Sequence, residues 1–287
     1  MTKDKIMITG STSGVAIELA SHLKKYNVIK VSRSQIDVIK NFCKYENFII
    51  KNKPKIIINC IAANGIDYCE NNPQEAFKIN TAFPVFLAKI SQRIGAKLIH
   101  FSTAAVFSGK KFKKLYDENS IANPNTIYGL SKYFADEFLS CYTNILILRV
   151  PMLYGPTHKK QLISRLLLKI MKNHKIYASS DVYSTPLYIP ELAKIIVGII
   201  KNKKKFFSKK SAEIINVSSK NYISIYQLVR KYAIYLKKTG NLVDVKNKYF
   251  SNALIKPKYL GLKSKKKYTS QMLINDCVKD HLEKINK

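Results

Sequence analysis

The chain has 287 residues, of which 46% are hydrophobic and 24% are charged, a composition typical of a folded globular protein. This length allows either one large domain or two domains that share a cleft. The formal net charge of +32 would suit a polyanionic partner such as nucleic acid. Only five of the fifty basic residues are arginine, however, and recognition of bases and phosphates depends strongly on arginine. We therefore expect no nucleic-acid partner.

Cysteine and apolar patterns limit the compartment and the class of protein. The five cysteines are odd in number and contain no C-x-x-C spacing, which argues against a disulfide framework and favours a reducing cytoplasm. The chain begins without the pattern of a signal peptide. Its longest apolar stretch, 189–200, contains two charged residues and is too short to span a bilayer, so no membrane insertion is expected. The five histidines are scattered, and no metal site is predicted.

The first strand and the turn after it indicate a phosphate site. An apolar strand over 5–9 is followed by the turn Gly10-Ser11-Thr12-Ser13-Gly14, and a helical period begins at Val15. Amide groups at the start of such a helix would face a pyrophosphate, and small residues let the backbone approach it closely. An ordinary strand-to-helix turn has the same appearance, so the turn alone leaves both interpretations open.

The end of the second strand bears on the cofactor. This strand is expected over 27–31, and Ser32 and Arg33 follow it directly. In a dinucleotide fold this position meets the adenosine ribose, where an acidic residue would bind the 2′-hydroxyl of NAD. A hydroxyl and a guanidinium suit the 2′-phosphate of NADP instead.

Strands and helices then alternate, which predicts an α/β protein with a doubly wound parallel sheet. Further strands are expected over 55–59, 98–102, 144–149 and 214–217, and helices over 73–82, 84–94, 161–171 and 225–236, with a lysine-rich loop over 201–210. We expect a Rossmann domain over 1–150, joined by about 186–207, and a smaller C-terminal substrate-binding region made of 151–185 and 208–287.

The stretch 97–132 contains the candidate catalytic residues. Its apolar strand delivers Ser102 and Thr103, and Tyr128 and Lys132 follow at the start of a helix, four residues apart and therefore on one face. A nearby ammonium lowers the pKa of a phenol, so Tyr128 could exchange a proton with a carbonyl or alcohol oxygen that Thr103 holds. Tyr26 and Tyr259 also begin a Y-x-x-x-K sequence. Only Tyr128 follows a strand that ends in hydroxyl residues; the other interpretation is an interface tyrosine with a surface lysine.

Several segments together resemble the extended short-chain dehydrogenase/reductase family, with the closest likeness to dTDP-4-dehydrorhamnose reductases and their relatives. The likeness covers about residues 4–235, and the order and spacing of its motifs carry it rather than any single one. The matching segments are 6–14, 32–37, 59–63, Asn80, 102–109, 128–132, 148–156, 185–192 and 216–218.

The resemblance implies a role for each residue that matches a family motif. Tyr128 would be the general acid, Lys132 would bind the nicotinamide ribose and lower the pKa of Tyr128, and Thr103 would hold the substrate oxygen. The cofactor would be NADP(H), with NAD(H) as the alternative, in contact with Gly10, Ser11, Thr12, Ser13, Gly14, Val15, Ser32, Arg33, Cys60, Ala62, Ala63, Asn80 and Lys132. The sugar of a nucleotide-sugar substrate would contact Ala104, Val106, Met152 and Tyr154.

Two departures from the family pattern leave alternatives open. The glycine pattern G-x-x-G-x-x-G is here Gly10, Ser13 and Ala16, and Ala104-Ala105 replaces the Asp-Tyr that usually follows the threonine. The resemblance implies reduction of a nucleotide-activated 4-keto-6-deoxy sugar for surface-polysaccharide synthesis, with a homodimer as the expected assembly. The alternatives are an epimerase or dehydratase that recycles NAD, and a non-enzymatic relative that binds NADP and regulates a partner.

Overall fold

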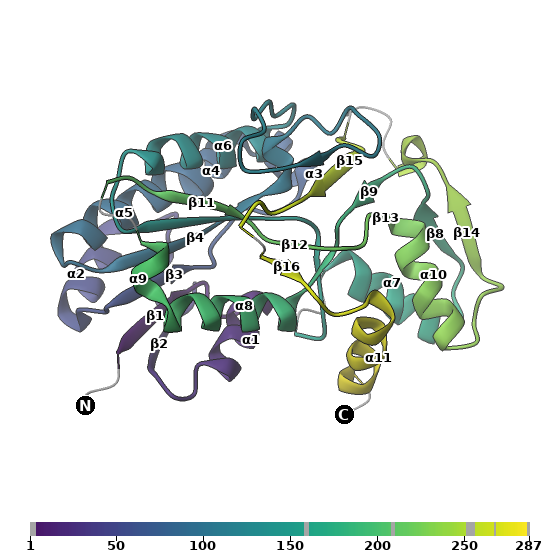
Figure 1. Ribbon diagram of the computed structural model, residues 1–287, viewed down its shortest axis with the longest axis horizontal. Helices are drawn as coiled ribbons and strands as arrows, with labels where there is room; N and C mark the ends of the chain where they lie inside the picture. The colour runs from purple at the N-terminus through teal and green to yellow at the C-terminus, as the bar shows by residue number, and fades with distance from the viewer. Residues whose placement is uncertain (1–3, 158–160, 208–209, 251–255, 267, 286–287) are drawn as a thin grey trace.

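Six parallel strands form the central sheet of the computed structural model, which describes residues 4–157, 161–207, 210–250, 256–266 and 268–285 (Figure 1). Their order is β11-β6-β4-β3-β1-β2, and every neighbouring pair is parallel. The strands are β1 (Lys5–Thr9), β2 (Asn27–Val31), β3 (Ile56–Asn59), β4 (Lys97–Thr103), β6 (Ile145–Val150) and β11 (Glu213–Asn216). The chain leaves β1 toward β2 on one side and later enters β3 on the other side, so the strand order reverses next to β1.

Alternating strand residues enter two separate cores, one on each face of the sheet. Ile6 and Ile8 pack into the first core, while Met7 between them packs into the second. In β3, likewise, Ile56 and Ile58 pack into the first core and Ile57 packs into the second. Because side chains of a strand point alternately to opposite faces, a continuous apolar run is what a sheet covered on both faces requires.

Helices from different parts of the chain cover these two faces (Figure 1). α1 (Gly14–His22) and α8 (Ile189–Lys201) contribute to the first core, and α2 (Phe42–Asn52), α5 (Phe83–Arg93) and α6 (Ile127–Ser140) contribute to the second. This arrangement confirms the predicted α/β class with a doubly wound parallel sheet. None of the helices in the part of the chain described has the length and apolar character needed to cross a bilayer.

A smaller layer lies beside the sheet, at the right in Figure 1, with a third core of its own. It contains α7 (Leu162–Met171), α10 (Ile225–Tyr235), α11 (Ile274–Ile285), β8 (Ile176–Ser179) and β14 (Leu242–Val245). The remaining elements are short: α3 (Ile66–Asn71), α4 (Pro73–Phe77), η1 (Lys78–Ala82), η2 (Ala104–Val106), β5 (Leu115–Tyr116), β7 (Leu153–Tyr154), β9 (Tyr183–Ser184), β10 (Leu187–Tyr188), α9 (Lys203–Phe206), β12 (Ser218–Ser219), β13 (Ile223–Ser224), η3 (Asn247–Phe250), β15 (Tyr259–Leu262) and β16 (Thr269–Ser270).

Some local expectations need correction. The predicted helices 73–82 and 84–94 form one continuous run, α4, η1 and α5, in which η1 is a turn of π-helix. Part of the predicted loop 201–210 is the short helix α9, and residues 208–209 lie outside the described ranges. β11 pairs with β6 in the large sheet although it falls within 208–287. The division into two functional domains itself stays a prediction.

Candidate active site

The turn after β1 lies where the strand order reverses, which is where open α/β sheets bind ligands. Gly10 has φ +65°, and a Cβ there would lie 2.9 Å from Ile61 Cγ1 and 3.0 Å from the Cys60 carbonyl carbon. Glycine is therefore required at this point, both for the backbone conformation and for the close approach to the segment after β3. The result is a narrow cradle at the start of α1 that fits a dinucleotide pyrophosphate.

Serine at the second position of the glycine pattern has a structural use. Ser13 has φ −72°, so it needs no glycine, and its hydroxyl accepts a hydrogen bond from Ala16 N at 3.3 Å. It is the N-cap of α1, and Ala16 is buried against the first core. The altered pattern thus keeps the turn and the helix, and Ser13, Gly14 and Val15 line the cleft described below.

The carboxyl ends of β1, β3 and β4 are tied together by a polar contact that the sequence did not reveal. Asn59 accepts a hydrogen bond from the Thr9 hydroxyl at 2.8 Å, and its amide nitrogen lies 3.2 Å from His100 Nδ1. All three side chains are buried, and burial lowers the pKa of His100 well below its ordinary value. His100 is therefore neutral and helps to fix the floor of the site.

Ser32 and Arg33 follow β2 at the exposed outer end of the site, away from the residues that line the cleft. Arg33 Nε lies 3.5 Å from Asp37 Oδ2, and the guanidinium side chain is 69% exposed. The Ser32 hydroxyl contacts Gln35 and Ser34. An exposed guanidinium beside a hydroxyl suits a phosphate monoester at this position.

Thr103, Tyr128 and Lys132 all lie in one cleft, as the sequence predicted. Thr103 ends β4, while Tyr128 and Lys132 come from the first two turns of α6. The Thr103 hydroxyl accepts a hydrogen bond from Ala105 N at 3.1 Å, and it lies near enough to the Tyr128 hydroxyl to lower the pKa of that phenol. These contacts place a hydroxyl pair beside the phosphate cradle.

The start of α6 is capped twice, which fixes the backbone of Tyr128. Thr126 is the N-cap and accepts a hydrogen bond from Gly129 N at 3.1 Å. Glu70 of α3 accepts a second one from Ile127 N at 2.8 Å. Both acceptors satisfy amide groups that otherwise lack partners at a helix start, and the carboxylate also complements the helix dipole.

The predicted lowering of the Tyr128 pKa is wrong. Desolvation raises the pKa of Tyr128 above its ordinary value, although the nearby Thr103 hydroxyl opposes this shift. Lys132 is not among the groups that shift this pKa, and its Nζ donates a hydrogen bond to the Phe101 carbonyl oxygen at 2.9 Å. Tyr128 is therefore held in its protonated form.

Lys132 is itself buried, with 2% of its surface exposed, and burial lowers its pKa to about 8. The Asp136 carboxylate, one turn further along α6, opposes this shift. Asp136 is ion-paired with Arg149 of β6 at 2.9 Å, and both side chains are buried. The pair places a negative group behind Lys132 that helps to keep it charged.

Asn80 has a different position from the one expected. It is fully buried in the π-helical turn η1, accepts a hydrogen bond from Ala63 N at 2.9 Å, and donates to Ala63 O and Ser131 Oγ, each at 3.0 Å. Thr81 donates to Ser131 O at 2.6 Å. Neither Asn80 nor Ala63 lines the cleft. The π turn therefore clamps the segment after β3 to α6 directly before Lys132, a role typical of π-bulges near functional sites.

The cleft has a volume of about 700 Å³ and lies between the sheet and the smaller layer. Cys60, Ala62, Ala104 and Met152, which were predicted to contact the cofactor or the sugar, line it, and so does Ala105. Its far wall was not predicted, because it comes from segments distant in sequence: Gln161, Leu162, Arg165, Val182, Tyr183, Ser184, Ile225, Pro257 and Leu260. The sequence signal for this wall was the predicted helix over 161–171.

Two expected substrate contacts do not reach the cleft. Val106 is fully buried in a small core with Phe107 and Tyr116. Tyr154 is buried in the third core beside Tyr188 and His281, with its ring centroid 5.4 Å from that of Tyr188. Val106 ends η2 and Tyr154 ends β7, and both side chains point into protein cores and not into the cleft.

A family model described as RmlD substrate binding domain matches residues 4–285. The chain is 29% identical over 199 residues to the spore coat polysaccharide biosynthesis protein SpsK of Bacillus subtilis (strain 168), which covers 68% of this chain and 69% of that protein. It is 27% identical over 200 residues to the dTDP-4-dehydrorhamnose reductase of Aggregatibacter actinomycetemcomitans, covering 68% and 67%.

Among solved structures, the dTDP-4-dehydrorhamnose reductase of Bacillus anthracis str. Ames, in complex with NADP, superposes with a TM-score of 0.88 over 99% of both chains at 23% identity. This likeness shows a shared fold. The family match over nearly the whole chain, together with the cradle after β1 and the Tyr128–Lys132 helix beside it, confirms the predicted resemblance. The chain belongs to the RmlD substrate binding domain family, an RmlD-like branch of the extended short-chain dehydrogenases/reductases.

Proposed function

We propose that this protein is an NADP(H)-dependent oxidoreductase that reduces the ketone of a nucleotide-activated 4-keto-6-deoxy sugar. The observation that carries the proposal is that Thr103, Tyr128 and Lys132 line one cleft, next to the phosphate cradle. The chain also belongs to a reductase-like family. Relatives named for dTDP-4-dehydrorhamnose reduction and for polysaccharide biosynthesis support it, and sugar synthesis for a surface polysaccharide is the process it fits.

The residues present fit NADP(H). The pyrophosphate would lie at the cradle of Gly10–Val15, where a Cβ at Gly10 has no room, and the 2′-phosphate would meet Ser32 and Arg33. When bound, the cofactor supplies the hydride for the carbonyl carbon. Cys60 and Ala62 would pack beside it, while Ala104 and Met152 would face the sugar.

Proton transfer would be the work of Tyr128. Its raised pKa keeps the phenol protonated at neutral pH, which is the form that a general acid needs. Thr103 would orient the ketone oxygen through its hydroxyl, and Tyr128 would give that oxygen its proton as the hydride reaches the carbon. The resulting phenolate would be stabilised by the Lys132 ammonium on the same helix face, after which a proton from solvent restores the phenol.

Replacing Tyr128 with phenylalanine tests this function. Turnover of dTDP-4-dehydrorhamnose, followed as loss of NADPH absorbance, should fall about 10²- to 10⁴-fold, because a positioned general acid contributes that much. NADPH binding, measured by calorimetry, should stay unchanged. Tyr26→Phe is the matched control, since Tyr26 also begins a Y-x-x-x-K sequence but does not line the cleft.

The two alternatives give different results in the same experiment. Undiminished turnover by the Tyr128→Phe protein would remove Tyr128 from the mechanism. An epimerase or dehydratase would convert sugar nucleotides without net consumption of NADPH and would release nucleotide when denatured. A regulatory relative would bind NADPH but turn over no member of a panel of sugar nucleotides.

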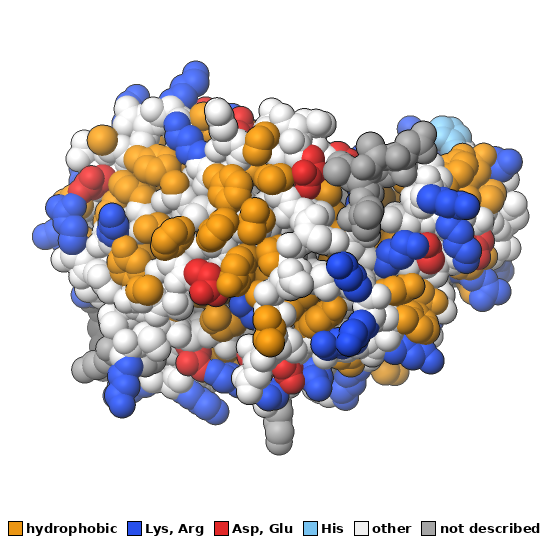
Figure 2. All heavy atoms as spheres, turned by 90° about the horizontal axis from the view of Figure 1, so that it is seen from above, with side chains coloured by type: hydrophobic (Ala, Val, Ile, Leu, Met, Phe, Trp, Pro, Cys, Tyr) orange, Lys and Arg blue, Asp and Glu red, His pale blue; other side chains and the backbone are white. Residues whose placement is uncertain are grey.

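Partners beyond the substrate are part of the proposal. Figure 2 shows hydrophobic side chains gathered on the upper face of the molecule, where α4 and α6 lie in Figure 1. Phe134 and Phe138 of α6 are exposed there, and Phe134 is in contact with Phe77 of α4. Exposed rings of this kind fit an interface between two copies of the chain. A nucleic-acid partner is still not expected, and a reducing cytoplasm remains the expected compartment.

A further inference from the structure

The charges that line the cleft are all of one sign. Two cationic side chains, Lys132 and Arg165, line the cleft, and none of its described lining residues is an aspartate or glutamate. A cleft lined by one sign of charge concentrates ligands of the opposite sign. The ligands of this cleft should therefore be anions, and each cation can be assigned separately.

Lys132 already has a partner and a role. Its ammonium donates to the Phe101 carbonyl oxygen and is buried on the sheet side of the cleft. Arg165 stands on the opposite wall. Its side chain makes no ion pair or hydrogen bond with any residue in the described ranges, and its backbone amide donates to Gln161 O within α7. A guanidinium has five donors, and none of those of Arg165 is taken up by a residue in the described ranges.

The helix that carries Arg165 is fixed in position. Ile163, Leu167 and Ile170 of α7 are buried in the third core. Gln161 and Arg165 are four residues apart and lie on the face of α7 that lines the cleft. The first turn contains no acidic residue, and the buried Gln161 Oε1 has no hydrogen-bond partner among the residues described. This face of α7 thus presents polar groups and one cation to the cleft from a rigid support.

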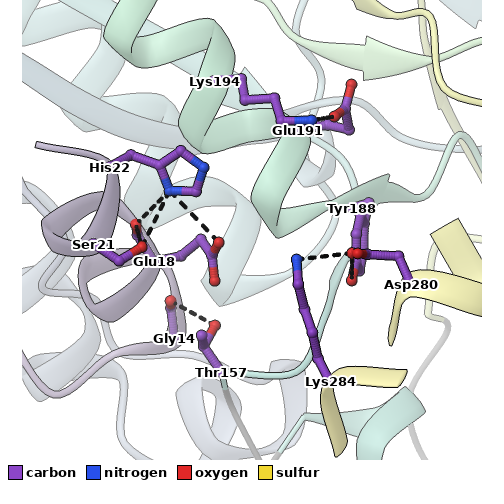
Figure 3. A network of polar contacts seen from close by, with 10 residues as sticks. All are labelled: Gly14, Glu18, Ser21, His22, Thr157, Tyr188, Glu191, Lys194, Asp280 and Lys284. Atoms are coloured by element: carbon purple, nitrogen blue, oxygen red, sulfur yellow. Dashed lines mark hydrogen bonds and ion pairs between the residues drawn. The ribbon is translucent and has the colours of Figure 1, made fainter. Parts of the chain in front are cut away.

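The position of Arg165 favours the substrate over the cofactor. The cradle for the cofactor pyrophosphate belongs to the sheet layer and has its own helix start at α1. Arg165 belongs to the smaller layer. The two walls meet at Thr157, whose hydroxyl donates to Gly14 O at 2.8 Å (Figure 3). An anion that Arg165 binds would therefore lie across the cleft from the cradle, on the substrate side.

We infer that Arg165 binds the diphosphate of the nucleotide-sugar substrate, an assignment that rests on the proposed function. A diphosphate carries several negative charges, and a guanidinium binds phosphate oxygens through two parallel hydrogen bonds. Bound in this way, the diphosphate anchors the substrate at α7, and the sugar extends toward Thr103 and Tyr128 within the same cleft. Arg165 is then a specificity residue that distinguishes nucleoside diphosphates from uncharged sugars and nucleosides.

The experiment compares Arg165→Met and Arg165→Lys with Lys169→Met. Lys169 is the matched control because it lies one turn further along α7, exposed and outside the cleft. Calorimetry on the NADP⁺-saturated protein measures the affinity for dTDP, UDP, GDP and thymidine. We expect Arg165→Met to weaken binding of the preferred diphosphate by about 10- to 100-fold, because losing a hydrogen bond to a charged group lowers the affinity by about that factor. Arg165→Lys should lose less, and Lys169→Met should bind as the parent does.

The remaining outcomes separate the two proposals. Thymidine binding should change little in Arg165→Met, so the ratio between diphosphate and nucleoside affinity should shrink. Weaker NADPH binding with unchanged dTDP binding would move Arg165 to the cofactor site and overturn the inference. Unchanged binding of every diphosphate, or none in the parent protein, would overturn it as well. If diphosphate binding depends on Arg165 but no keto-sugar is reduced, the binding assignment stands and the proposed reaction fails.

Discussion

Gly129 lies directly against the main chain of Ala105: a Cβ added at Gly129 would come 2.2 Å from the Ala105 carbonyl oxygen. This contact lets the first turn of α6 approach η2, and it brings Tyr128 close to Thr103 in the same cleft. Gly129 is therefore required for packing. It affects catalysis indirectly, by setting the position of Tyr128.

Replacement of Gly129 by alanine should reduce kcat about 100-fold. The added methyl must push α6 away from η2, and a displacement of about 1 Å can cost that much. The control is Gly198→Ala in α8, where a Cβ would meet no atom within 4 Å. That change should raise the free energy of unfolding by about 0.4–1 kcal/mol and leave kcat unchanged. An active Gly129→Ala protein would show that Tyr128 tolerates a shift.

The pH dependence should report the charge of Lys132. Its pKa of about 8 means that the ammonium loses its proton above that pH, so kcat/KM should fall on the alkaline side. The Asp136 carboxylate raises this pKa, so Asp136→Asn should move the alkaline limb to lower pH. Glu137→Gln, at an exposed neighbour on the same helix, should leave the limb in place. A limb that does not move in Asp136→Asn would mean that Lys132 is not the titrating group.

Asp136→Asn should also destabilise the protein, which makes a second measurement useful. The change leaves Arg149 buried without its anionic partner, and breaking a buried pair costs about 3–5 kcal/mol. Chemical unfolding at pH 7 measures this loss. The pH limb is then recorded at a temperature where both proteins are folded, so that the shift reflects the site alone.

Arg33 should determine the preference for NADP(H). Arg33→Ala should raise the KM for NADPH about 10- to 100-fold and leave that for NADH nearly unchanged, because only NADPH carries the 2′-phosphate. Arg93→Ala is a matched control: Arg93 is 62% exposed and ion-paired with Glu46, as Arg33 is 69% exposed and paired with Asp37. Equal losses for both cofactors would place Arg33 outside the phosphate site.

We expect Asn80 to contribute mainly to the free energy of unfolding of the protein and not directly to the reaction. Asn80→Ala leaves the buried N–H and C=O groups of Ala63 without partners, which should lower the free energy of unfolding by about 2–4 kcal/mol. Asn202→Ala removes an exposed amide that donates to Gly198 O and should cost less than about 0.5 kcal/mol. Denaturant titration measures both. Similar losses would indicate that the clamp between η1 and the segment after β3 contributes little.

The exposed rings of α6 provide a test of self-association. If the α6 face joins two copies, Phe138→Glu should convert a dimer into a monomer in sedimentation equilibrium, because it buries a charge at the interface. Phe250→Glu is the control, since Phe250 is exposed to a similar extent, 48% against 53%. A parent protein that is already monomeric at high concentration would contradict the proposed homodimer.

Local pattern determined much of this protein. The apolar runs defined the strands of the sheet, because strands buried on both faces need continuous apolar residues. The strand-then-hydroxyl context separated Tyr128 and Lys132 from two chance matches of the same spacing, and the family motifs placed the cradle of Gly10 and Ser13. These features depend on neighbours in sequence, so the sequence alone was sufficient to predict them.

Tertiary structure decided what depends on distant segments. The far wall of the cleft, with Arg165 and Tyr183, is formed by the packing of the smaller layer against the sheet. The side chains of Val106 and Tyr154 point into protein cores, and the Lys132 ammonium points to a backbone carbonyl oxygen. Burial and hydrogen bonding depend on neighbours in space, so the sequence did not reveal these directions. The π turn that places Asn80 against Ala63 and Ser131 has the same origin. Residue order specifies the elements, whereas packing sets the direction of each side chain and the pKa of each buried group.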